Sequence, residues 1–283
     1  MPAIEKKVVS ASRRVEMVGF YPEKLLTFLE NRLPPSRVHT LVLWTKHPKP
    51  ILNNSFLCNK LKQYDQCFIH FTITGMGNTI LEPGILSTLD NLSFLPDLID
   101  FVQDPKRICI RFDPIVKLLL PDGDTYTNLE LFPKIAEACN KYKIQNMKVS
   151  WMSPYPKVIS RLKQKGIIFN ELSQGQWKKE SEWVQYHAEK YGITVSGCCV
   201  PGWPNSQCID GNLLSELHPE KQLASNEKSA GQRDHCGCTK SWDIGWYYAC
   251  PGGCLYCYAN PKVFSDLKGQ SPEREKEIIL RQL

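Results

Sequence analysis

The amino-acid sequence predicts an α/β fold: a partial (β/α) barrel of six to seven parallel strands with a cysteine-rich C-terminal cover. Three observations lead to this prediction. Short apolar runs alternate with helical patterns over the first two thirds of the chain, polar residues gather directly after the apolar runs, and eight of the 12 cysteines fall in the last third. Short continuous apolar runs are typical of parallel strands buried on both faces, and strands that alternate with helices form right-handed βαβ units.

The apolar runs define the expected strands, because each is short, continuous and rich in β-branched or aromatic residues. The predicted strands cover residues 7–12, 40–45, 67–74, 107–112, 147–151 and 193–196, and a last strand at residues 242–248 leads into a cysteine-rich loop.

Helical periodicity, caps and breaks define the helices between these strands. The predicted helices cover residues 22–31, 86–103, 129–141, 156–165 and 181–191, with a looser helical patch at 213–217 and a terminal helix at 271–283. Pro22 and Pro272 suit a first helical turn, and Gly166 and Gly192 suit the position just after a helix.

Composition divides the chain into three parts. Residues 1–197 form the barrel body. Residues 198–240 are rich in Pro, Gly, Asn and Ser, so we expect a cover segment that wraps over one end of the barrel and carries a candidate auxiliary metal site. Residues 241–283 contain the last strand, the cysteine loop and the terminal helix, which complete the barrel.

Charge and hydropathy limit where the protein could be located and which partners it could bind. The N-terminus is charged and lacks the apolar core of a signal peptide, and no apolar stretch reaches the roughly 18 residues of a membrane span. We therefore expect a soluble, cytoplasmic protein with no membrane partner. The net charge of +6 slightly favours nucleic acid as a partner, but the basic residues occur as isolated pairs, which is typical of an ordinary solvated surface.

Polar side chains follow several predicted strands at the point where each strand ends. They are Arg13, Arg14, Lys46, His47, Thr72, Thr74, Arg111, Asp113 and Ser150. The carboxyl ends of parallel strands carry the active site in α/β sheets and barrels. Strand ends also exit to solvent, where polar residues are ordinary, but the agreement among several strands favours a polar cavity at this edge.

The most specific motif is the loop Cys250-Pro251-Gly252-Gly253-Cys254-Leu255-Tyr256-Cys257, with the spacing C-x3-C-x2-C. Three thiolates on one short loop can bind three irons of a four-iron four-sulfur cluster and leave the fourth iron open to a small molecule. The two glycines allow the tight turn. Structural zinc is an alternative, although its knuckles are typically C-x2-C pairs that supply four ligands. Unligated thiols are the remaining alternative.

A second group contains five further cysteines. In a reducing compartment, clustered cysteines bind metal or do redox chemistry more often than they form disulfides. Cys236 and Cys238 are two residues apart, so in an extended chain both thiols point to the same side. Cys208, with Cys198 or Cys199, could complete four ligands for a second iron–sulfur cluster, which we favour, or for a zinc ion. The scattered cysteines, expected to be small buried hydrophobes, are Cys58, Cys67, Cys109 and Cys139.

The spacing of the cysteine loop, with its aromatic Tyr256, resembles that of the radical S-adenosylmethionine superfamily. The resemblance implies that S-adenosylmethionine chelates the open iron. A reductant such as flavodoxin or ferredoxin would supply the electron that cleaves it to methionine and a 5′-deoxyadenosyl radical, which abstracts hydrogen from a substrate that the sequence does not name. The Gly-Gly-Glu element that usually binds the methionine amino group is absent as such.

Nearly the whole chain also resembles a bacterial and archaeal family of domains of unknown function. The matching motifs are residues 10–14, 44–48, 71–75, 81–84, 111–114 and 236–260. The chain departs from that family at Val15-Glu16-Met17-Val18, where Thr-Asp-Ile-Pro is usual, and at Gly252, where histidine is common.

Residues 45–46, 72–74 and 81–84 further resemble segments of spore photoproduct lyase-like radical S-adenosylmethionine proteins, where they follow the cysteine loop instead of preceding it. We infer a circular permutation that moved the cluster-bearing first strand to the end of the chain. In a barrel, the first and last strands are neighbours, so the loop would stay at the same mouth.

This resemblance implies that Tyr256 lies against the adenine and that Lys46, Thr74 and Arg111 belong to the cofactor site. Lys46 and Arg111 could meet the carboxylate of the cofactor or an anionic substrate. The equally supported alternative is ion pairing at the barrel mouth with acidic residues such as Asp113 or Glu82.

Two other functions are compatible with the sequence. One is a zinc-stabilised barrel that binds nucleic acid through its weak positive charge. The other is an iron–sulfur electron carrier or sensor that does not turn over S-adenosylmethionine.

Overall fold

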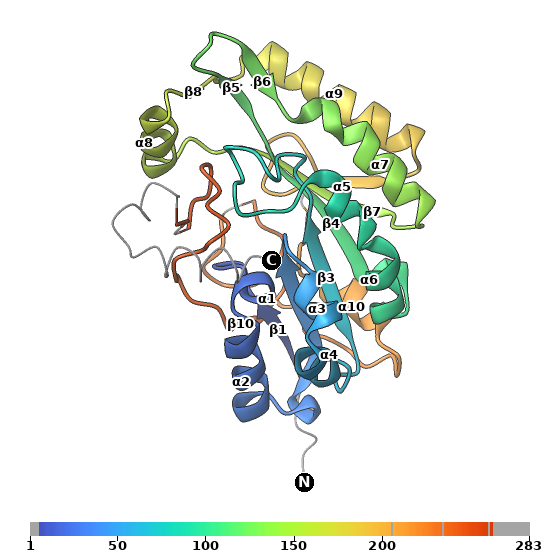
Figure 1. Cartoon of the computed structure of the whole chain (residues 1–283). Coiled ribbons are helices and arrows are strands. Elements are labelled where there is room, and N and C mark those ends of the chain that lie inside the picture. Colours follow the sequence, from blue (N-terminus) through green and yellow to red (C-terminus); the bar gives the residue numbers. More distant parts are fainter. Residues whose placement is uncertain (1–5, 205, 234, 260, 263–283) are drawn as a thin grey trace, which may run out of the picture.

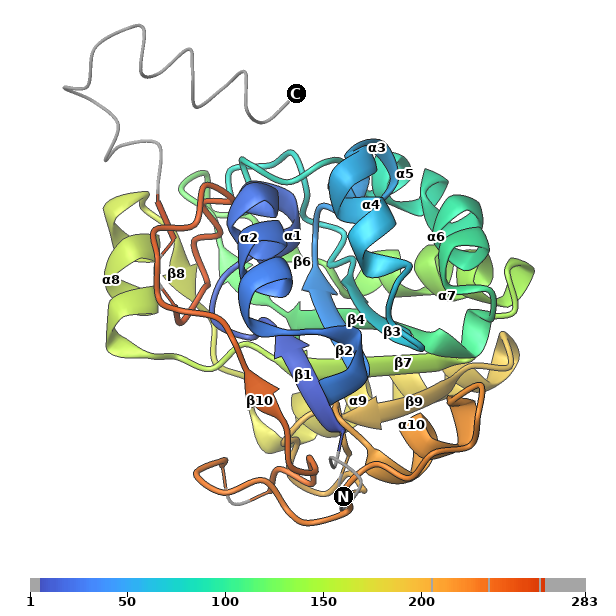
Figure 2. The ribbon, with the colours of Figure 1, turned by 90° about the horizontal axis from the view of Figure 1, so that it is seen from below.

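The fold is built around one parallel sheet. The computed structural model describes residues 6–204, 206–233, 235–259 and 261–262. Within these residues, seven parallel strands form the sheet in the spatial order β10–β1–β2–β3–β4–β7–β9 (Figures 1 and 2). The strands are β1 (Lys7–Ala11), β2 (Val38–Thr45), β3 (Cys67–Thr72), β4 (Ile108–Ile115), β7 (Asn146–Trp151), β9 (Thr194–Gly197) and β10 (Trp242–Asp243). The predicted α/β class and partial barrel are confirmed.

Helices connect successive strands. They are α1 (Met17–Phe20), α2 (Pro22–Arg32), α3 (Lys49–Asn53), α4 (Ser55–Leu61), α5 (Thr88–Ser93), α6 (Leu95–Val102), α7 (Phe132–Lys141), α8 (Pro156–Gln164), α9 (Gln174–Lys190) and α10 (Gly211–Leu217). The helix predicted at 86–103 is two helices, because Pro96 has no N–H for a continuous ladder and instead suits the first turn of α6. The helix predicted at 181–191 starts earlier, at a capping box between Ser173 and Gln176. The short helices α1, α3 and α4 were not predicted.

A small antiparallel sheet follows β4 and was also missed. It contains β5 (Lys117–Leu119), β6 (Thr125–Thr127) and β8 (Ile168–Phe169) in the order β6–β5–β8. Its signal in the sequence is Pro121-Asp122-Gly123, a turn in which Gly123 has a φ of 93°. Leu118 of β5 joins Leu162 of α8 and Leu255 of the cysteine loop in one apolar cluster. The hairpin and α8 therefore support the cysteine loop from one side.

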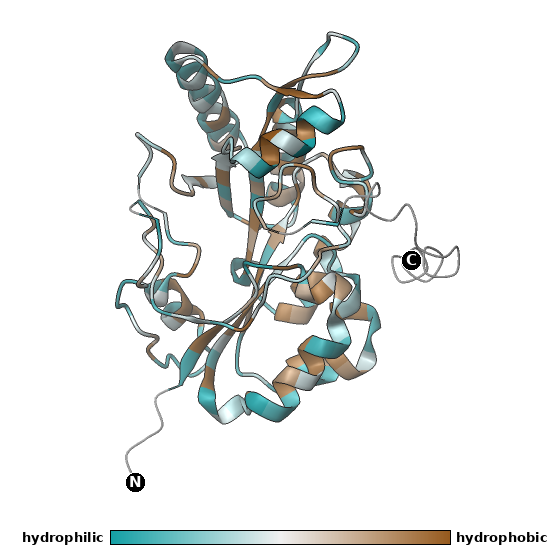
Figure 3. Ribbon diagram, turned by 90° about the vertical axis from the view of Figure 1, so that its left-hand side faces the viewer, coloured by the Kyte–Doolittle hydropathy of each residue, from teal (hydrophilic) through white to brown (hydrophobic). Residues whose placement is uncertain are grey.

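The outer face of the main sheet packs against helices. Side chains alternate between the two faces of a strand, and Leu41, Leu43, Ile69 and Phe71 all belong to the largest apolar cluster. The same cluster contains buried residues of α2, α4, α6, α7 and α9. Figure 3 shows hydrophobic colouring along the strands and hydrophilic colouring on the exposed sides of the helices.

The inner face of the main sheet is covered by the cysteine-rich segment. Val42 and Phe68 pack with Leu214 and Leu217 of α10 in a separate apolar cluster. Figure 2 shows this segment, in orange, on the side of the sheet opposite α2, α4 and α6. The expectation that residues 198–240 wrap over one end of the barrel is therefore corrected. The apolar side chains of α10 gain burial against Val42 and Phe68 on this face of the sheet.

The last strand lies beside the first. In β10, Trp242 pairs with Val9 of β1 and Asp243 pairs with Ser10, in the parallel direction. The strand is shorter than the predicted 242–248 because the chain turns away from the ladder at Gly245. In this turn the Gly245 N–H donates to the Asp243 carboxylate at 2.9 Å. The chain then runs into the cysteine loop.

Two expectations concern the chain ends and the membrane. The terminal helix predicted at 271–283 lies outside the described residues. Among the residues that the structure describes, no helix has the length and apolar character needed to cross a membrane.

The packing of the cover segment predicts a large effect of Leu214→Ala. Leu214 is 2% exposed and contacts the inner sheet face, so truncation removes apolar contacts and leaves a cavity. We expect the free energy of unfolding to fall by about 2–5 kcal/mol, measured by urea denaturation.

The matched control is Leu223→Ala in the same segment. Leu223 is 85% exposed, so its truncation should change the unfolding free energy by less than about 0.5 kcal/mol. Equal, small effects of the two substitutions would contradict the packing of this segment on the sheet.

Candidate functional site

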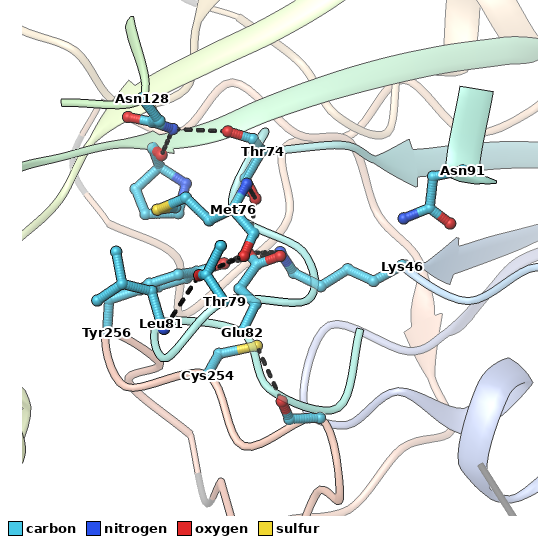
Figure 4. Close-up of polar contacts among 12 residues, drawn as sticks. Lys46, Thr74, Met76, Thr79, Leu81, Glu82, Asn91, Asn128, Cys254 and Tyr256 are labelled. Carbon is cyan, nitrogen blue, oxygen red and sulfur yellow. Dashed lines mark hydrogen bonds and ion pairs between the residues drawn. The ribbon is translucent and has the colours of Figure 1, made fainter. Parts of the chain in front are cut away.

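A buried carboxylate, Glu82, is the centre of the polar network at the carboxyl edge of the sheet (Figure 4). Lys46 follows β2, and its Nζ lies 2.7 Å from Glu82 Oε1 and 2.7 Å from the Tyr256 hydroxyl oxygen. Thr74 follows β3 and donates its hydroxyl to the same Oε1 at 2.6 Å. Tyr256, on the cysteine loop, also donates to this oxygen. Three of the four predicted cofactor residues therefore meet on one carboxylate.

The electrostatics of this network keep its donors protonated. Glu82 is 1% exposed, and a buried carboxylate requires a cation or several donors. Burial alone would lower the pKa of Lys46, but the Glu82 carboxylate, which it contacts, outweighs burial and the pKa is raised. Burial and the Glu82 carboxylate raise the pKa of Tyr256 well above its usual value. The network therefore consists of the Lys46–Glu82 ion pair and two hydroxyl donors.

The Leu81-Glu82-Pro83-Gly84 segment joins this network to the cysteine loop. Gly84 N donates to Gly252 O at 3.2 Å, and Leu255 N donates to Leu81 O at 3.0 Å. A Cβ on Gly84 would lie 2.4 Å from Pro251 O, so only glycine permits this approach. The segment that supplies the carboxylate thus also binds the backbone of the cysteine loop.

Asn128 holds the neighbouring loops in place and was missed by sequence reasoning. Its side-chain amide donates to Thr74 O at 2.8 Å and to Pro114 O at 3.0 Å (Figure 4). Its carbonyl oxygen accepts from Val116 N at 2.8 Å, and the residue is fully buried. A single asparagine in a polar stretch carries no signal that distinguishes such a role.

The cysteine loop places its three thiols close enough to interact electrostatically. Gly253 has a φ of 62°, and Cys257 N donates to Cys254 O at 3.1 Å, which closes the turn. Cys257 Sγ accepts from Ala259 N at 3.3 Å, and Cys250 Sγ accepts from backbone N–H groups. Burial raises the pKa of Cys250 to about 12 and raises those of Cys254 and Cys257.

Glu16 is a further residue of this edge that the sequence analysis did not select. Its carboxylate accepts from Lys46 N at 2.6 Å, Thr45 Oγ1 at 2.7 Å and Gly19 N at 2.9 Å. Burial raises its pKa to about 7, although these hydrogen bonds act in the opposite direction. Its backbone N–H also reaches the Cys250 thiol. The signal was present: a lone carboxylate among apolar residues after a strand.

Arg111, the fourth predicted cofactor residue, lies in a separate cluster. It pairs with Asp113, which also accepts from the Ser150 hydroxyl. Its guanidinium lies 5.1 Å from the centre of the Trp44 ring and donates to Cys208 Sγ at 3.0 Å. Both ion pairs named as alternatives, Lys46–Glu82 and Arg111–Asp113, are present.

The second cysteine group is assembled around Cys208. Cys198 Sγ lies 3.7 Å from Cys208 Sγ, and Cys208 N donates to Cys238 Sγ at 3.3 Å. Cys199 and Cys236 are close enough to interact with each other electrostatically. Hydrogen bonds from the Cys198 and Cys238 thiols hold the pKa of Cys208 well below its usual range. The predicted second group is therefore one spatial cluster.

In neither cysteine group are the side chains fully converged. Across the described ranges, no three His, Cys, Asp or Glu side chains meet in an arrangement that could hold a metal ion. Cys198 Sγ and Cys208 Sγ lie 3.7 Å apart, but binding one ion requires other cysteine side chains to rotate about their Cα–Cβ bonds. Of the scattered cysteines, Cys67, Cys109 and Cys139 are buried as expected and Cys58 is partly exposed.

Comparison with known proteins identifies one family. The model of a family described as a domain of unknown function, DUF1848, matches residues 28–259. No curated protein matches the chain.

The approach of the Glu82 segment to the cysteine loop predicts the effect of Gly84→Ala. The added Cβ would contact backbone atoms of Pro251 and Gly252, which cannot yield as a flexible side chain would. We expect the free energy of unfolding to fall by about 1–3 kcal/mol, measured by urea denaturation.

The control for this substitution is Gly175→Ala in α9, where a Cβ meets no atom within 4 Å. Because alanine favours a helix over glycine, this variant should be as stable as the wild type or more so. A Gly84→Ala protein of wild-type stability would contradict the tight docking of the two segments.

The burial of the His47 side chain predicts that the stability of the protein depends on pH. Its side chain is 6% exposed and stacks on Phe20 with ring centres 5.9 Å apart. Burial, with the charge of Lys49, lowers its pKa from 6.5 to about 4. Between these values the unfolded state binds more protons than the folded state, so stability falls as the pH falls, by up to about 1.4 kcal/mol per pH unit.

The measurement is urea denaturation of wild type and His47→Gln from pH 7 to pH 4. The wild type should lose more stability over this range than the variant, because glutamine does not titrate. His235→Gln, at an exposed position, is the control and should follow the wild type. Parallel curves for wild type and His47→Gln would contradict the depressed pKa.

Proposed function

We propose that this chain, which belongs to the DUF1848 family of domains of unknown function, is a radical S-adenosylmethionine enzyme whose Cys250, Cys254 and Cys257 bind a four-iron four-sulfur cluster. The observation that carries this proposal is the position of the C-x3-C-x2-C loop. It follows β10, which pairs with β1, and it lies at the carboxyl edge of the parallel sheet (Figure 1). Active sites of α/β barrels form at this edge.

The loop fits a cluster in two respects. First, backbone N–H groups donate to the sulfurs of Cys250 and Cys257, and such hydrogen bonds are one means by which proteins set the reduction potentials of iron–sulfur clusters. Second, burial raises the pKa of all three thiols, so a cation is needed to hold them as thiolates, as bound iron would. When bound, a cluster with an open iron would supply the electron for reductive cleavage of S-adenosylmethionine.

The Lys46–Glu82 ion pair suits the amino-acid end of S-adenosylmethionine, which carries an ammonium and a carboxylate. A zwitterion can exchange partners with a buried ion pair without leaving a net charge, which would be costly in this buried position. We assign the amino group to Glu82 and the carboxylate to Lys46. This pair would take the role of the Gly-Gly-Glu element that the sequence lacks.

Tyr256 and Thr74 would hold Glu82 in position during that exchange. Both donate hydroxyl protons to Glu82 Oε1, and the high pKa of Tyr256 keeps its proton in place. The neighbouring cluster of Arg111, Asp113 and Trp44 borders the same edge and would face the substrate. Its charges neutralise each other, which suits a polar substrate whose chemical identity stays open.

The decisive experiment is cleavage of S-adenosylmethionine. Protein purified without oxygen is reconstituted with iron and sulfide, reduced with dithionite and mixed with S-adenosylmethionine. We expect the wild type to form 5′-deoxyadenosine, detected by chromatography, and Cys254→Ala to form at least about tenfold less, because loss of one thiolate disrupts the cluster.

The matched control is Cys58→Ala, because Cys58 lies on α4, away from the cysteine loop. It should retain wild-type product formation. A protein that binds iron and sulfide but forms no 5′-deoxyadenosine would contradict the proposal and favour an electron carrier or sensor. Protein that holds zinc alone at the loop would exclude radical chemistry and favour a zinc-stabilised binding protein.

A further inference from the structure

We propose that Cys198, Cys208, Cys236 and Cys238 bind a single zinc ion that fastens the cover segment, residues 198–240, to the main sheet. The inference does not depend on the cysteine loop or on S-adenosylmethionine, because none of its ligands belongs to that loop. It rests on the distance between two sulfurs, on the anchoring of the backbone that carries them, and on the groups that surround them.

The distance between Cys198 Sγ and Cys208 Sγ is 3.7 Å. Two thiolates on one tetrahedral zinc, with Zn–S bonds of about 2.3 Å, lie about 3.8 Å apart. In a four-iron four-sulfur cluster each thiolate binds a different iron, so the cysteine sulfurs are farther apart. The pair therefore has the spacing of ligands to one ion, in contrast to the iron–sulfur cluster that the sequence favoured.

The backbone at three of the ligands is fixed before any ion binds. Cys198 N donates to Val149 O of β7 at 2.8 Å. Cys208 O accepts from His70 Nε2 of β3 at 2.6 Å. Thr239 N, next to Cys238, donates to Ile209 O at 2.9 Å. Hydrogen bonds thus attach Cys198 and Cys208 to the sheet, and attach the segment that carries Cys238 to the segment that carries Cys208.

The surroundings of the sulfurs suit thiolates on a cation. Cys238 Sγ accepts from Cys208 N at 3.3 Å, and N–H donors of this kind orient and stabilise metal-bound sulfur. A zinc ion with four thiolates carries a net charge of about −2. Arg111 Nη1 lies 3.0 Å from Cys208 Sγ and Arg233 Nη2 lies 3.7 Å from Cys198 Sγ. Both guanidinium groups donate toward the sulfurs, although Asp113 also pairs with Arg111 and shares its charge.

Cys236 is the better fourth ligand. It lies two residues before Cys238, and thiols at this spacing in an extended segment point to the same side. Gly237 between them donates its N–H to Ser206 O at 3.3 Å, and a Cβ there would lie 3.1 Å from that oxygen, so the segment packs tightly on Ser206. Cys199 is the alternative, and it directly follows Cys198 and has a φ of 54°. Neighbouring residues would then both have to direct their thiols to one ion, although no residue lies between them. To bind the ion, the Cys236 side chain would have to turn toward the other three thiols.

Such an ion would join the two ends of the cover segment to the main sheet. The cover segment leaves β9 at one edge of the sheet, packs on the inner face and returns to β10 at the other edge. It contains little regular structure besides α10. A metal clamp between its two ends and the sheet would stabilise it, because the binding energy of a structural zinc becomes folding energy.

The test uses the full chain with Cys250, Cys254 and Cys257 all changed to alanine, so that the loop contributes no metal. We expect about one zinc per chain by elemental analysis, with no sulfide. Replacement of zinc by cobalt(II) should give the absorption bands of tetrahedral cobalt with thiolate ligands. The cobalt spectrum is read on the folded protein and needs no further substitution.

Further substitutions assign the ligands. Cys208→Ala, Cys238→Ala and Cys236→Ala should each lower the zinc affinity at least about tenfold in a chelator competition, whereas Cys199→Ala and Cys58→Ala should leave it unchanged. Absence of zinc and of the cobalt spectrum, or iron together with sulfide, would overturn the proposal. Loss of zinc in Cys199→Ala but not in Cys236→Ala would overturn the assignment of the fourth ligand.

Discussion

The Asp243 carboxylate joins the last strand of the sheet to the first, and the position of the candidate site depends on it. It accepts hydrogen bonds from Ser10 Oγ at 3.1 Å, Ser12 Oγ at 3.0 Å, Arg13 N at 3.1 Å and Gly245 N at 2.9 Å. A Cβ on Gly245 would lie 1.6 Å from Ser12 Oγ, so glycine is required beside this contact. A strand of two residues could not hold its register by ladder bonds alone. The carboxylate therefore sets where the chain enters the cysteine loop.

From this junction, charge pairing organises the carboxyl edge of the sheet. Lys46 follows β2 and Arg111 lies within β4, and each is matched by a nearby carboxylate, Glu82 or Asp113. A buried charge without a partner would destabilise the fold by several kcal/mol. The pairs keep the edge polar and neutral, and both adjoin a cysteine group. The same arrangement stabilises the fold and provides groups that can exchange partners with a charged ligand.

Much of the fold could be predicted because buried parallel strands appear in the sequence as continuous apolar runs. The run at residues 40–45 became most of β2, and the run at 67–74 became β3. The small antiparallel sheet was missed because its strands have two or three residues, too few to show a period, and only the Gly123 turn marked it. Glu16 could have been found as a carboxylate in an apolar run. Asn128 could not, since its role depends on loops that approach it from β3 and β4.

The sequence by itself determined the order of the main-sheet strands and of the longer helices, the polar residues that follow the strands, and the spacing of the three thiols in the cysteine loop. These features depend on residues close together in the chain. Only the tertiary structure decided that Lys46 and Tyr256, 210 positions apart, share one carboxylate. It also decided that Arg111 lies in another cluster and that the cover segment packs on the inner sheet face. Such contacts depend on strand order and on which face each side chain takes, and both are set by how all the apolar surfaces are buried together.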